Sequence, residues 1–314
     1  AQRCIDRRGH DTVGPGYCGG NDYQDVVPVR DAEGAAGHAV RQLSLLTGAA
    51  DLAAALPGTG LEPALDRLWD DVHEPKLYVS GGLGSRHRGE SFGDPYERPP
   101  DRAYSETCAA IANFHWNWRM LLSRGDSKYA DEMERGLYNA IAVSTAVDGR
   151  SFFYSNPLHL RPGHVHDVDA PSRRLDWYEC ACCPPNLARL LASITGYLVS
   201  ESDDALSVHL FAQGSYSFSD GTPFTVATDY PWKPDIDFAF DAPSPKPVRV
   251  RVPSWADAQL VADGVALRCE AGGYSTIPAG TLVATLTIPV DPALIAPHPR
   301  IDAVRGSVAI RRGP

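Results

Sequence analysis

The stretch WYECACCPPN, residues 177–186, holds three cysteines within four positions, and two prolines directly follow the adjacent pair Cys182 and Cys183. Prolines fit the first turn of a helix, where the partial positive charge of the helix end lowers the pKa of a thiol. Two adjacent thiolates repel each other unless a cation lies between them. Because zinc binds cysteine thiolates in tetrahedral four-ligand sites, the stretch predicts a zinc site at the start of a helix.

A disulfide and a pair of buried, inert thiols are the two other interpretations of these cysteines. A disulfide between adjacent residues is strained. The chain also has seven cysteines, an odd number, and its 314 residues are too many to need disulfide staples. This usage favours a reducing compartment, so we expect a cytoplasmic protein. For Cys4, Cys18 and Cys269 we expect buried thiols without a chemical role.

The segment YSETCAA supplies two further candidate ligands, because Glu106 lies two residues before Cys108. Residues i and i+2 of a regular helix point about 200° apart and cannot share a metal ion. They can share one at the first turn of a helix or just before it, and Ser105 is a suitable N-cap there. The two segments together predict a Cys3Glu zinc site of Glu106, Cys108, Cys182 and Cys183. Their spacing leaves open whether this site is structural or catalytic.

A glycine-rich loop precedes these ligands; it starts at residue 81, has glycines at positions 81, 82, 84, 89 and 93, and carries Glu90. Glycines let a loop approach other groups closely, so a carboxylate on this loop is a candidate general acid and base. An exposed glutamate without a role is the alternative. Asp94, Glu97 and Asp101 are equally acidic, and composition alone does not single out Glu90.

Helical periodicity dominates the first two thirds of the chain, and short alternating runs dominate the rest. We expect helices at residues 34–56 (with a break at Thr47), 61–76, 103–125, 129–147 and 184–200. We expect strands at residues 205–219, 222–232, 246–255, 259–267, 281–290 and 301–313. Short links between helices indicate antiparallel hairpins, as in a bundle or an α/α barrel. The predicted fold is therefore helices followed by an antiparallel β-sandwich, with a domain boundary near residue 200.

The charge and the hydropathy exclude two classes of partner. A net charge of −10 argues against nucleic acid, because phosphate binding needs a basic patch. No apolar run reaches the roughly 18 residues that suggest a membrane span. The chain begins without a methionine and ends directly after a strand-like run, so we expect it to be a fragment.

Five segments occur in the order GHAVR, GGLGSRHRGESF, AYSETCA, FFYSNPL and ECACCPPNLARLLAS. Together they resemble glycoside hydrolase family 127, the β-L-arabinofuranosidases, and the resemblance runs from about Tyr23 to the end. It implies an (α/α)6 barrel followed by β-sandwich domains. Residues 1–200 would then form a catalytic barrel that lacks its first part, and residues 201–314 a jelly-roll-like sandwich truncated at its C-terminus.

The resemblance also implies roles for individual residues. Zinc is held by the four ligands named above, Cys182 is the nucleophile, and Glu90 is the acid and base. Cys182 attacks the anomeric carbon while Glu90 protonates the leaving oxygen, and Glu90 then deprotonates water. L-Arabinofuranose is thereby released from a small-molecule or oligosaccharide β-L-arabinofuranoside with retention of configuration. His38 and Tyr154 are implied sugar contacts, for which a helix histidine and a core tyrosine are the alternatives.

Two other functions use the same residues differently. A non-catalytic, zinc-stabilised carbohydrate-binding scaffold gives Cys182 and Glu90 no chemical role. A zinc hydrolase activates a metal-bound water and forms no covalent bond between sugar and protein. The segment before the cysteines carries His159, His164 and His166, and it either reshapes the sugar pocket or lies on the surface.

Overall fold

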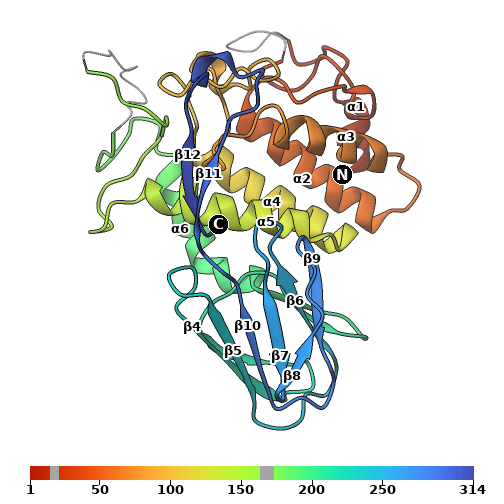
Figure 1. The fold of residues 1–314 in the computed structure, drawn as a ribbon. Coiled ribbons are helices and arrows are strands. Elements are labelled where there is room, and N and C mark those ends of the chain that lie inside the picture. Colours follow the sequence, from red (N-terminus) through yellow and green to blue (C-terminus); the bar gives the residue numbers. More distant parts are fainter. Residues whose placement is uncertain (15–20, 163–172) are drawn as a thin grey trace. The chain divides into compact units, whose positions relative to one another are not determined.

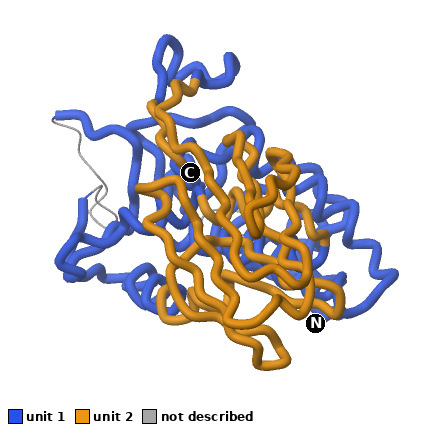
Figure 2. The backbone as a smooth tube through the Cα atoms, turned by 60° about the horizontal axis from the view of Figure 1, so that its bottom comes forward, with its two compact units in different colours: residues 1–123, 135–190, 296–309 blue, residues 124–134, 191–295, 310–314 orange. Residues whose placement is uncertain are grey.

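The computed structural model describes residues 1–14, 21–162 and 173–314 (Figure 1). Cys18, His164 and His166 lie outside these described residues. The chain divides into two compact units (Figure 2). The first unit contains residues 1–123, 135–190 and 296–309, and the second contains residues 124–134, 191–295 and 310–314. Each unit therefore combines segments that are far apart in the sequence.

The described part of the chain has a helix at each predicted position. They are α2 (Ala39–Ala55), α3 (Glu62–His73), α4 (Thr107–Arg124), α5 (Ser127–Gly136) and α6 (Cys183–Ser193), and a further short helix that was not predicted is α1 (Gln2–Arg7). The predicted break at Thr47 is wrong, because α2 runs through this position. The Thr47 hydroxyl donates to the carbonyl of Leu43 one turn earlier, which satisfies its polar group inside the helix.

The predicted helix at residues 129–147 is shorter than expected. α5 ends at Gly136, and the chain continues as a π-turn (Leu137–Ile141) and a 3-10 turn (Ala142–Ser144). A Cβ on Gly81 would lie 2.9 Å from the Cα of Gly136, and Gly81 has a φ of 78°. Glycine alone adopts this conformation without strain, so the glycine-rich loop begins directly against the end of α5.

Helices α2, α3 and α4 supply much of the core of the first unit. α2 contacts α3, and Leu68 on α3 and Ile111 and Trp116 on α4 are fully buried. Trp69 donates from its indole nitrogen to the side-chain oxygen of Asn117 on α4 over 2.8 Å. This pairing satisfies two buried polar groups and fixes α3 against α4.

The second unit contains two sheets. The six-stranded sheet has the order β3-β4-β5-β10-β7-β8, and the four-stranded sheet has the order β1-β2-β6-β9. Their strands are β1 (Val199–Glu201), β2 (Leu206–Val208), β3 (Gly214–Ser217), β4 (Pro223–Thr228), β5 (Asp235–Phe240), β6 (Val248–Val252), β7 (Gln259–Ala262), β8 (Val265–Leu267), β9 (Gly273–Ile277) and β10 (Val283–Thr287). A separate pair joins β11 (Pro292–Ile295) to β12 (Ala309–Arg312).

The prediction of a purely antiparallel architecture is wrong for one pair of strands. β2 and β6 run parallel, with Leu206 opposite Val248 and Val208 opposite Val250. The intervening chain forms β3, β4 and β5 of the other sheet, and such a long crossover permits a parallel neighbour. The six-stranded sheet has antiparallel neighbours at the described registers, and its alternating residues Phe224, Ile236 and Leu286 are fully buried.

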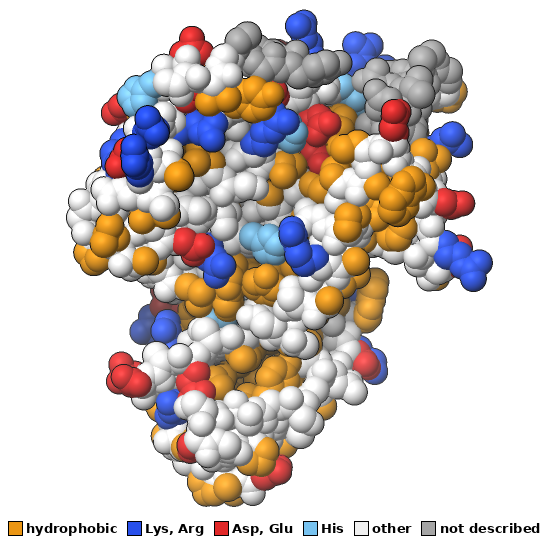
Figure 3. Space-filling model, turned by 180° about the vertical axis from the view of Figure 1, so that it is seen from behind, with side chains coloured by type: hydrophobic (Ala, Val, Ile, Leu, Met, Phe, Trp, Pro, Cys, Tyr) orange, Lys and Arg blue, Asp and Glu red, His pale blue; other side chains and the backbone are white. Residues whose placement is uncertain are grey.

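Charged side chains of both signs are interspersed with apolar ones on the face drawn in Figure 3. Among the helices that the structure describes, none combines the length and apolar character needed to cross a bilayer.

A buried ion cluster ties α5 to β6 inside the second unit. Arg251 on β6 is fully buried and pairs with the carboxylates of Asp131 and Glu134 on α5. Its Nε donates to the carbonyl of His209 over 2.7 Å, and Asp131 accepts from the backbone N–H of Ser254 over 3.0 Å. Burial raises the pKa of Glu134, and the charge of Arg251 opposes this shift. The guanidinium therefore keeps two buried carboxylates compensated.

Replacing Arg251 by methionine is expected to lower the free energy of unfolding by about 3–5 kcal/mol, because two buried carboxylates lose their counter-charge. Arg249 on the same strand is exposed, so Arg249→Met is the matched control and should cost less than about 1 kcal/mol. Urea denaturation followed by circular dichroism measures both values. Equal losses in the two variants would contradict the assigned role of the cluster.

Candidate active site

The sulfurs of Cys108, Cys182 and Cys183 and the carboxylate of Glu106 form one cluster in the first unit. Cys108 Sγ lies 3.4 Å from Cys183 Sγ and 3.7 Å from Cys182 Sγ, and the two adjacent sulfurs are 3.7 Å apart. Glu106 Oε1 lies 3.6 Å from Cys182 Sγ and 3.8 Å from Cys183 Sγ. The structure therefore brings together the four residues predicted as metal ligands.

These distances suit a tetrahedral zinc site. With usual zinc–ligand bond lengths, neighbouring sulfurs of a tetrahedron lie about 3.8 Å apart, and a sulfur and a carboxylate oxygen about 3.5 Å apart. Three thiols and one carboxylate are also a donor set that zinc accepts. Glu106 is buried, and its Oε2 has no hydrogen-bond partner among the described residues. The residues present thus fit a zinc ion.

Glu106 and Cys108 reach the same point because Glu106 lies just before α4. The backbone N–H groups of Ala109 and Ala110 donate to the Glu106 carbonyl over 3.0 and 3.2 Å, which starts the helix. Glu106 also pairs with Ser155 in an isolated β-bridge. The two side chains are therefore not held at the angle that two positions of a regular helix would impose, as the sequence predicts.

The adjacent cysteines lie at the start of α6, whose first residue is Cys183. The N–H of Asn186 donates to the Cys182 carbonyl over 3.3 Å, so Cys182 occupies the capping position. Cys183 is fully buried, whereas Cys182 is partly exposed and Cys108 is buried. Among the three clustered thiols, Cys182 is the one that a substrate can reach.

Burial and mutual hydrogen bonding shift the pKa values of the four clustered groups in different directions. Burial raises the pKa of Glu106, and the charges of Glu90 and Cys182 raise it further. Hydrogen bonding within the cluster raises the pKa of Cys183, and the pKa of Cys108 rises because of its contact with Cys182. The thiols of Cys108 and Cys183 both donate to Cys182 and lower its pKa to about 2. Without a cation, the negative charge therefore collects on the reachable sulfur.

Glu90 lies next to this cluster, on the 3-10 turn Arg88–Glu90. Its carboxylate, that of Glu106 and the imidazole of His38 lie within 4.8 Å of one another. Glu90 Oε2 lies 3.1 Å from His38 Nε2, and Glu90 Oε1 accepts from the Tyr154 hydroxyl over 3.3 Å. The structure therefore places both predicted sugar contacts on the predicted acid and base.

The backbone of Glu90 is strained, with a φ of 48°, and it follows Gly89 with a φ of 72°. Non-glycine residues rarely adopt such values, and they often do so at functional sites. Burial raises the pKa of Glu90, but the hydrogen bond and charge of His38 outweigh burial and leave the pKa below its usual value. His38 itself directly precedes α2, and its carbonyl accepts from Gln42 N over 3.0 Å.

Two buried tyrosines that the sequence did not single out complete the site. Tyr104 packs edge-on against Tyr154 with ring centroids 5.7 Å apart, and its hydroxyl hydrogen-bonds Glu90. The hydroxyl of Tyr178 accepts from the backbone N–H of Tyr154 over 3.1 Å. Both tyrosines could have been found from their positions next to the predicted ligands. Tyr104 lies two residues before Glu106, and Tyr178 lies four residues before Cys182.

The other acids of the glycine-rich loop pair away from the cluster. Arg86 forms ion pairs with the carboxylates of both Asp94 and Glu97. Asp101 Oδ2 lies 2.7 Å from Arg161 Nε. Geometry thus separates Glu90 from the acids that composition could not exclude.

Two cysteines outside the cluster differ from the prediction that they are buried. Cys4 is exposed and Cys269 is partly exposed, so the expectation of buried thiols is wrong for them. Each lies on a surface where the rest of its segment is also largely exposed. His159 is exposed as well.

Comparisons with known proteins point to one family. The family model described as the catalytic domain of GH127 β-L-arabinofuranosidases matches residues 1–196. The chain is 33% identical over 308 residues to the non-reducing end β-L-arabinofuranosidase of Bifidobacterium longum subsp. longum, covering 93% of this chain and 47% of that protein.

Solved structures agree with this match. A GH127 β-L-arabinofuranosidase from Geobacillus stearothermophilus T6 superposes with a TM-score of 0.90 at 35% identity, covering 98% of this chain and 53% of the other. A structure described as a GH127 β-arabinofuranosidase gives a TM-score of 0.89 at 32% identity, covering 98% and 51%. The chain thus spans about half the length of the relatives it matches.

A Cys108→Ser variant is expected to bind zinc more than about 100-fold more weakly, because one ligand of the buried cluster loses its thiolate. Competition with a chromophoric chelator measures this affinity, and Cys269→Ser in the second unit is the control that should change nothing. Equal zinc affinity in both variants would show that the cluster is not the metal site.

Proposed function

The chain belongs to glycoside hydrolase family 127, and we propose that its site hydrolyses β-L-arabinofuranosides with retention of configuration. The observation that carries this proposal is the closeness of one reachable thiol, Cys182, to a second carboxylate, Glu90. Both lie beside Glu106, whose Oε1 is 3.6 Å from Cys182 Sγ and whose carboxylate is within 4.8 Å of that of Glu90. Retaining glycosidases need such a pair, one group as nucleophile and the other as acid and base.

In the first step, Cys182 attacks the anomeric carbon and forms a carbon–sulfur bond while the bond to the leaving oxygen breaks. Glu90 gives that oxygen its proton. The negative charge of Cys182 opposes the lowering of the Glu90 pKa by His38, although the pKa stays below its usual value. In the second step, Glu90 removes a proton from water, and the resulting hydroxide displaces the sulfur and restores the original configuration.

His38 and Tyr154 hold Glu90 for both steps. The hydrogen bond from His38 lowers the pKa of Glu90, which favours the carboxylate once the proton has been given away. The Tyr154 hydroxyl occupies the second carboxylate oxygen and fixes its direction. Because both side chains contact Glu90, we also assign them to the substrate contact.

Glu106, Cys108, Cys182 and Cys183 would hold the zinc ion. When bound, zinc keeps the coordinated thiol deprotonated at neutral pH, which supplies the nucleophile.

The donor set argues against the two alternative functions. A zinc site that activates water keeps an open coordination position, whereas the four side chains here would supply all four ligands of a tetrahedral zinc ion. A purely structural site would have no need of a strained glutamate next to the cluster.

The domain organisation is part of the same proposal. Residues 1–200 would form part of an (α/α)6 barrel, and residues 201–314 would belong to a β-sandwich. The match of the family model to residues 1–196 and the first strand at Val199–Glu201 support this boundary. The unpaired state of the cysteines in the described residues is compatible with a cytoplasmic protein.

The variant Glu90→Gln should fold and retain zinc but lose about 10²- to 10⁴-fold in kcat on an aryl β-L-arabinofuranoside, because it can neither give nor take a proton. Initial rates followed by aryl alcohol release measure this loss. Glu33, whose side chain is 89% exposed, provides the control variant Glu33→Gln, which should keep wild-type rates. Undiminished turnover by Glu90→Gln would remove Glu90 from the mechanism.

A bromoacetylated β-L-arabinofuranosylamine should alkylate Cys182 in the folded, zinc-loaded protein, since the sugar places the reagent at the nucleophile. Peptide mass spectrometry locates the label, and excess L-arabinose should suppress it. Cys180 is exposed two residues away and serves as the internal comparison. Label on Cys180 with none on Cys182 would contradict covalent catalysis by Cys182.

A further inference from the structure

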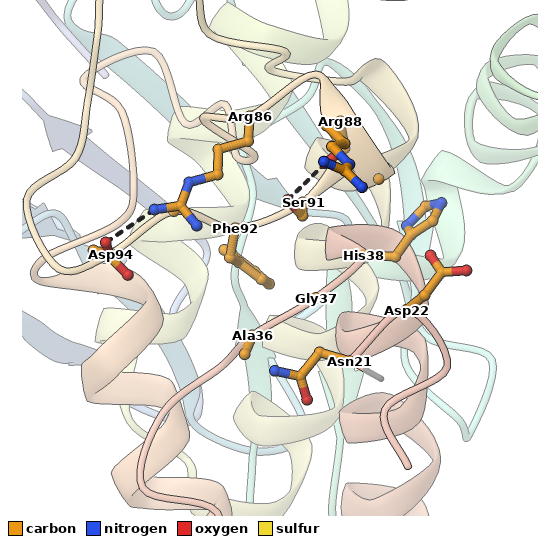
Figure 4. Close-up of a pocket in the computed structure, with 12 residues that line it drawn as sticks. Asn21, Asp22, Ala36, Gly37, His38, Arg86, Arg88, Ser91, Phe92 and Asp94 are labelled. Carbon is orange, nitrogen blue, oxygen red and sulfur yellow. Dashed lines mark hydrogen bonds and ion pairs between the residues drawn. The ribbon is translucent and has the colours of Figure 1, made fainter. Parts of the chain in front are cut away.

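A hollow of about 370 Å³ opens in the first unit (Figure 4). Gly89 and Ser91, the two neighbours of Glu90 in the chain, line it, and so do Arg88 and His38. Neither Glu90 itself nor any of the clustered cysteines lines it. The hollow therefore lies on the acid and base side of the site rather than on the nucleophile side.

This position matters because the acid and the nucleophile act on opposite sides of the scissile bond. The sugar must contact Cys182 at its anomeric carbon, whereas the leaving oxygen must come within hydrogen-bond reach of Glu90. The remainder of the leaving group extends beyond that oxygen, away from the sugar. A hollow walled by the Glu90 turn is thus placed to receive it.

The charged side chains around the hollow differ in how they are compensated. Arg86 turns to Asp94, away from Arg88 and His38 in Figure 4, and also binds Glu97. Asp22 lies 2.9 Å from the guanidinium of Arg41, and His38 lies against Glu90. These lining charges all have an opposite charge beside them.

Arg88 is the exception among the lining charges. Its backbone carbonyl accepts from the Ser91 hydroxyl over 3.0 Å, but no ion pair or hydrogen bond joins its guanidinium to another described residue. An unpaired guanidinium offers a planar set of donors that matches a carboxylate. The Arg88 side chain is also exposed, so the ligand can reach it from solvent.

We propose that this hollow is the leaving-group subsite and that Arg88 selects leaving groups that carry a carboxylate. The inference rests on the proposed glycosidase function and extends it to the substrate class. A carboxylate positioned against Arg88 compensates the lining charge that no described residue pairs. Arg88 acts on specificity and takes no part in proton transfer.

The test compares two substrates that differ in charge but not in size. They are the 4-carboxyphenyl and 4-carbamoylphenyl β-L-arabinofuranosides, and the measured quantity is the ratio of their kcat/KM values with the zinc-loaded holoenzyme. The intrinsic difference between the two leaving groups is the same for every variant, so it cancels when ratios are compared. Arg88→Gln should lower the carboxylate-to-amide ratio about fivefold, the upper range for an exposed ion pair.

Three further measurements separate charge from structure. Arg88→Lys should restore part of the ratio, because it keeps the positive charge. The effect of Arg88→Gln should shrink as salt rises from about 0.01 M to 1 M, because exposed charges are screened. The exposed Arg150 does not line the hollow, and its variant Arg150→Gln should leave the ratio unchanged.

The outcomes distinguish this inference from the proposed function on which it rests. Turnover of both substrates with the same ratio in wild type and Arg88→Gln overturns the subsite and leaves the glycosidase intact. Failure of the wild-type holoenzyme to hydrolyse either substrate overturns the glycosidase function itself, and the subsite with it.

Discussion

The arrangement of the site depends on the close approach of four acidic side chains, whose ligand atoms all lie within 4.8 Å of one another. Each must lose its proton to bind a metal, yet burying even one uncompensated charge costs several kcal/mol. Burial and mutual contact therefore keep most of the protons on Glu106, Cys108 and Cys183 when no cation is present. A bound divalent cation would favour loss of these protons, because its charge compensates the anions. The starts of α4 and α6, the β-bridge at Glu106 and the packing of the tyrosines all serve to hold four groups that would otherwise separate.

The ligand set was predictable from sequence because its chemistry is local. One segment has adjacent cysteines before two prolines, and the other has a glutamate two residues before a cysteine. Each segment supplies two candidate ligands, and a site with four ligands requires the two segments to meet. The identity of the acid and base was a different problem. Glu90 differs from Asp94 and Glu97 by its positive φ and by the partners that occupy the neighbouring acids. Neither property can be derived from composition, because both arise from how the loop closes against the helices. The family resemblance supplied what the residues alone could not.

The fold shows the same division between local and non-local information. Periodicity located the helices, since each buries one face, but it could not tell that Thr47 would bond back into α2 rather than break it. The strand β5 is absent from the expected strands, although its sequence DIDFAF alternates as clearly as its burial does. β9 is short and begins at Gly273, which weakens any strand pattern. The parallel pairing of β2 with β6 depends on a neighbour some forty residues away, and no local pattern encodes it.

The adjacency of Cys182 and Cys183 now has a physical reason. At the start of a helix, successive side chains point about 100° apart, so two neighbouring thiols can contact one metal ion while facing different surroundings. Cys183, the first helical residue, is buried in the core, and Cys182, the capping residue, remains partly exposed. In the proposed mechanism, Cys183 would anchor the metal while Cys182 is also offered to substrate. A pair spaced by a full helical turn would place both sulfurs on the same buried face, and the proposed nucleophile would lose its access.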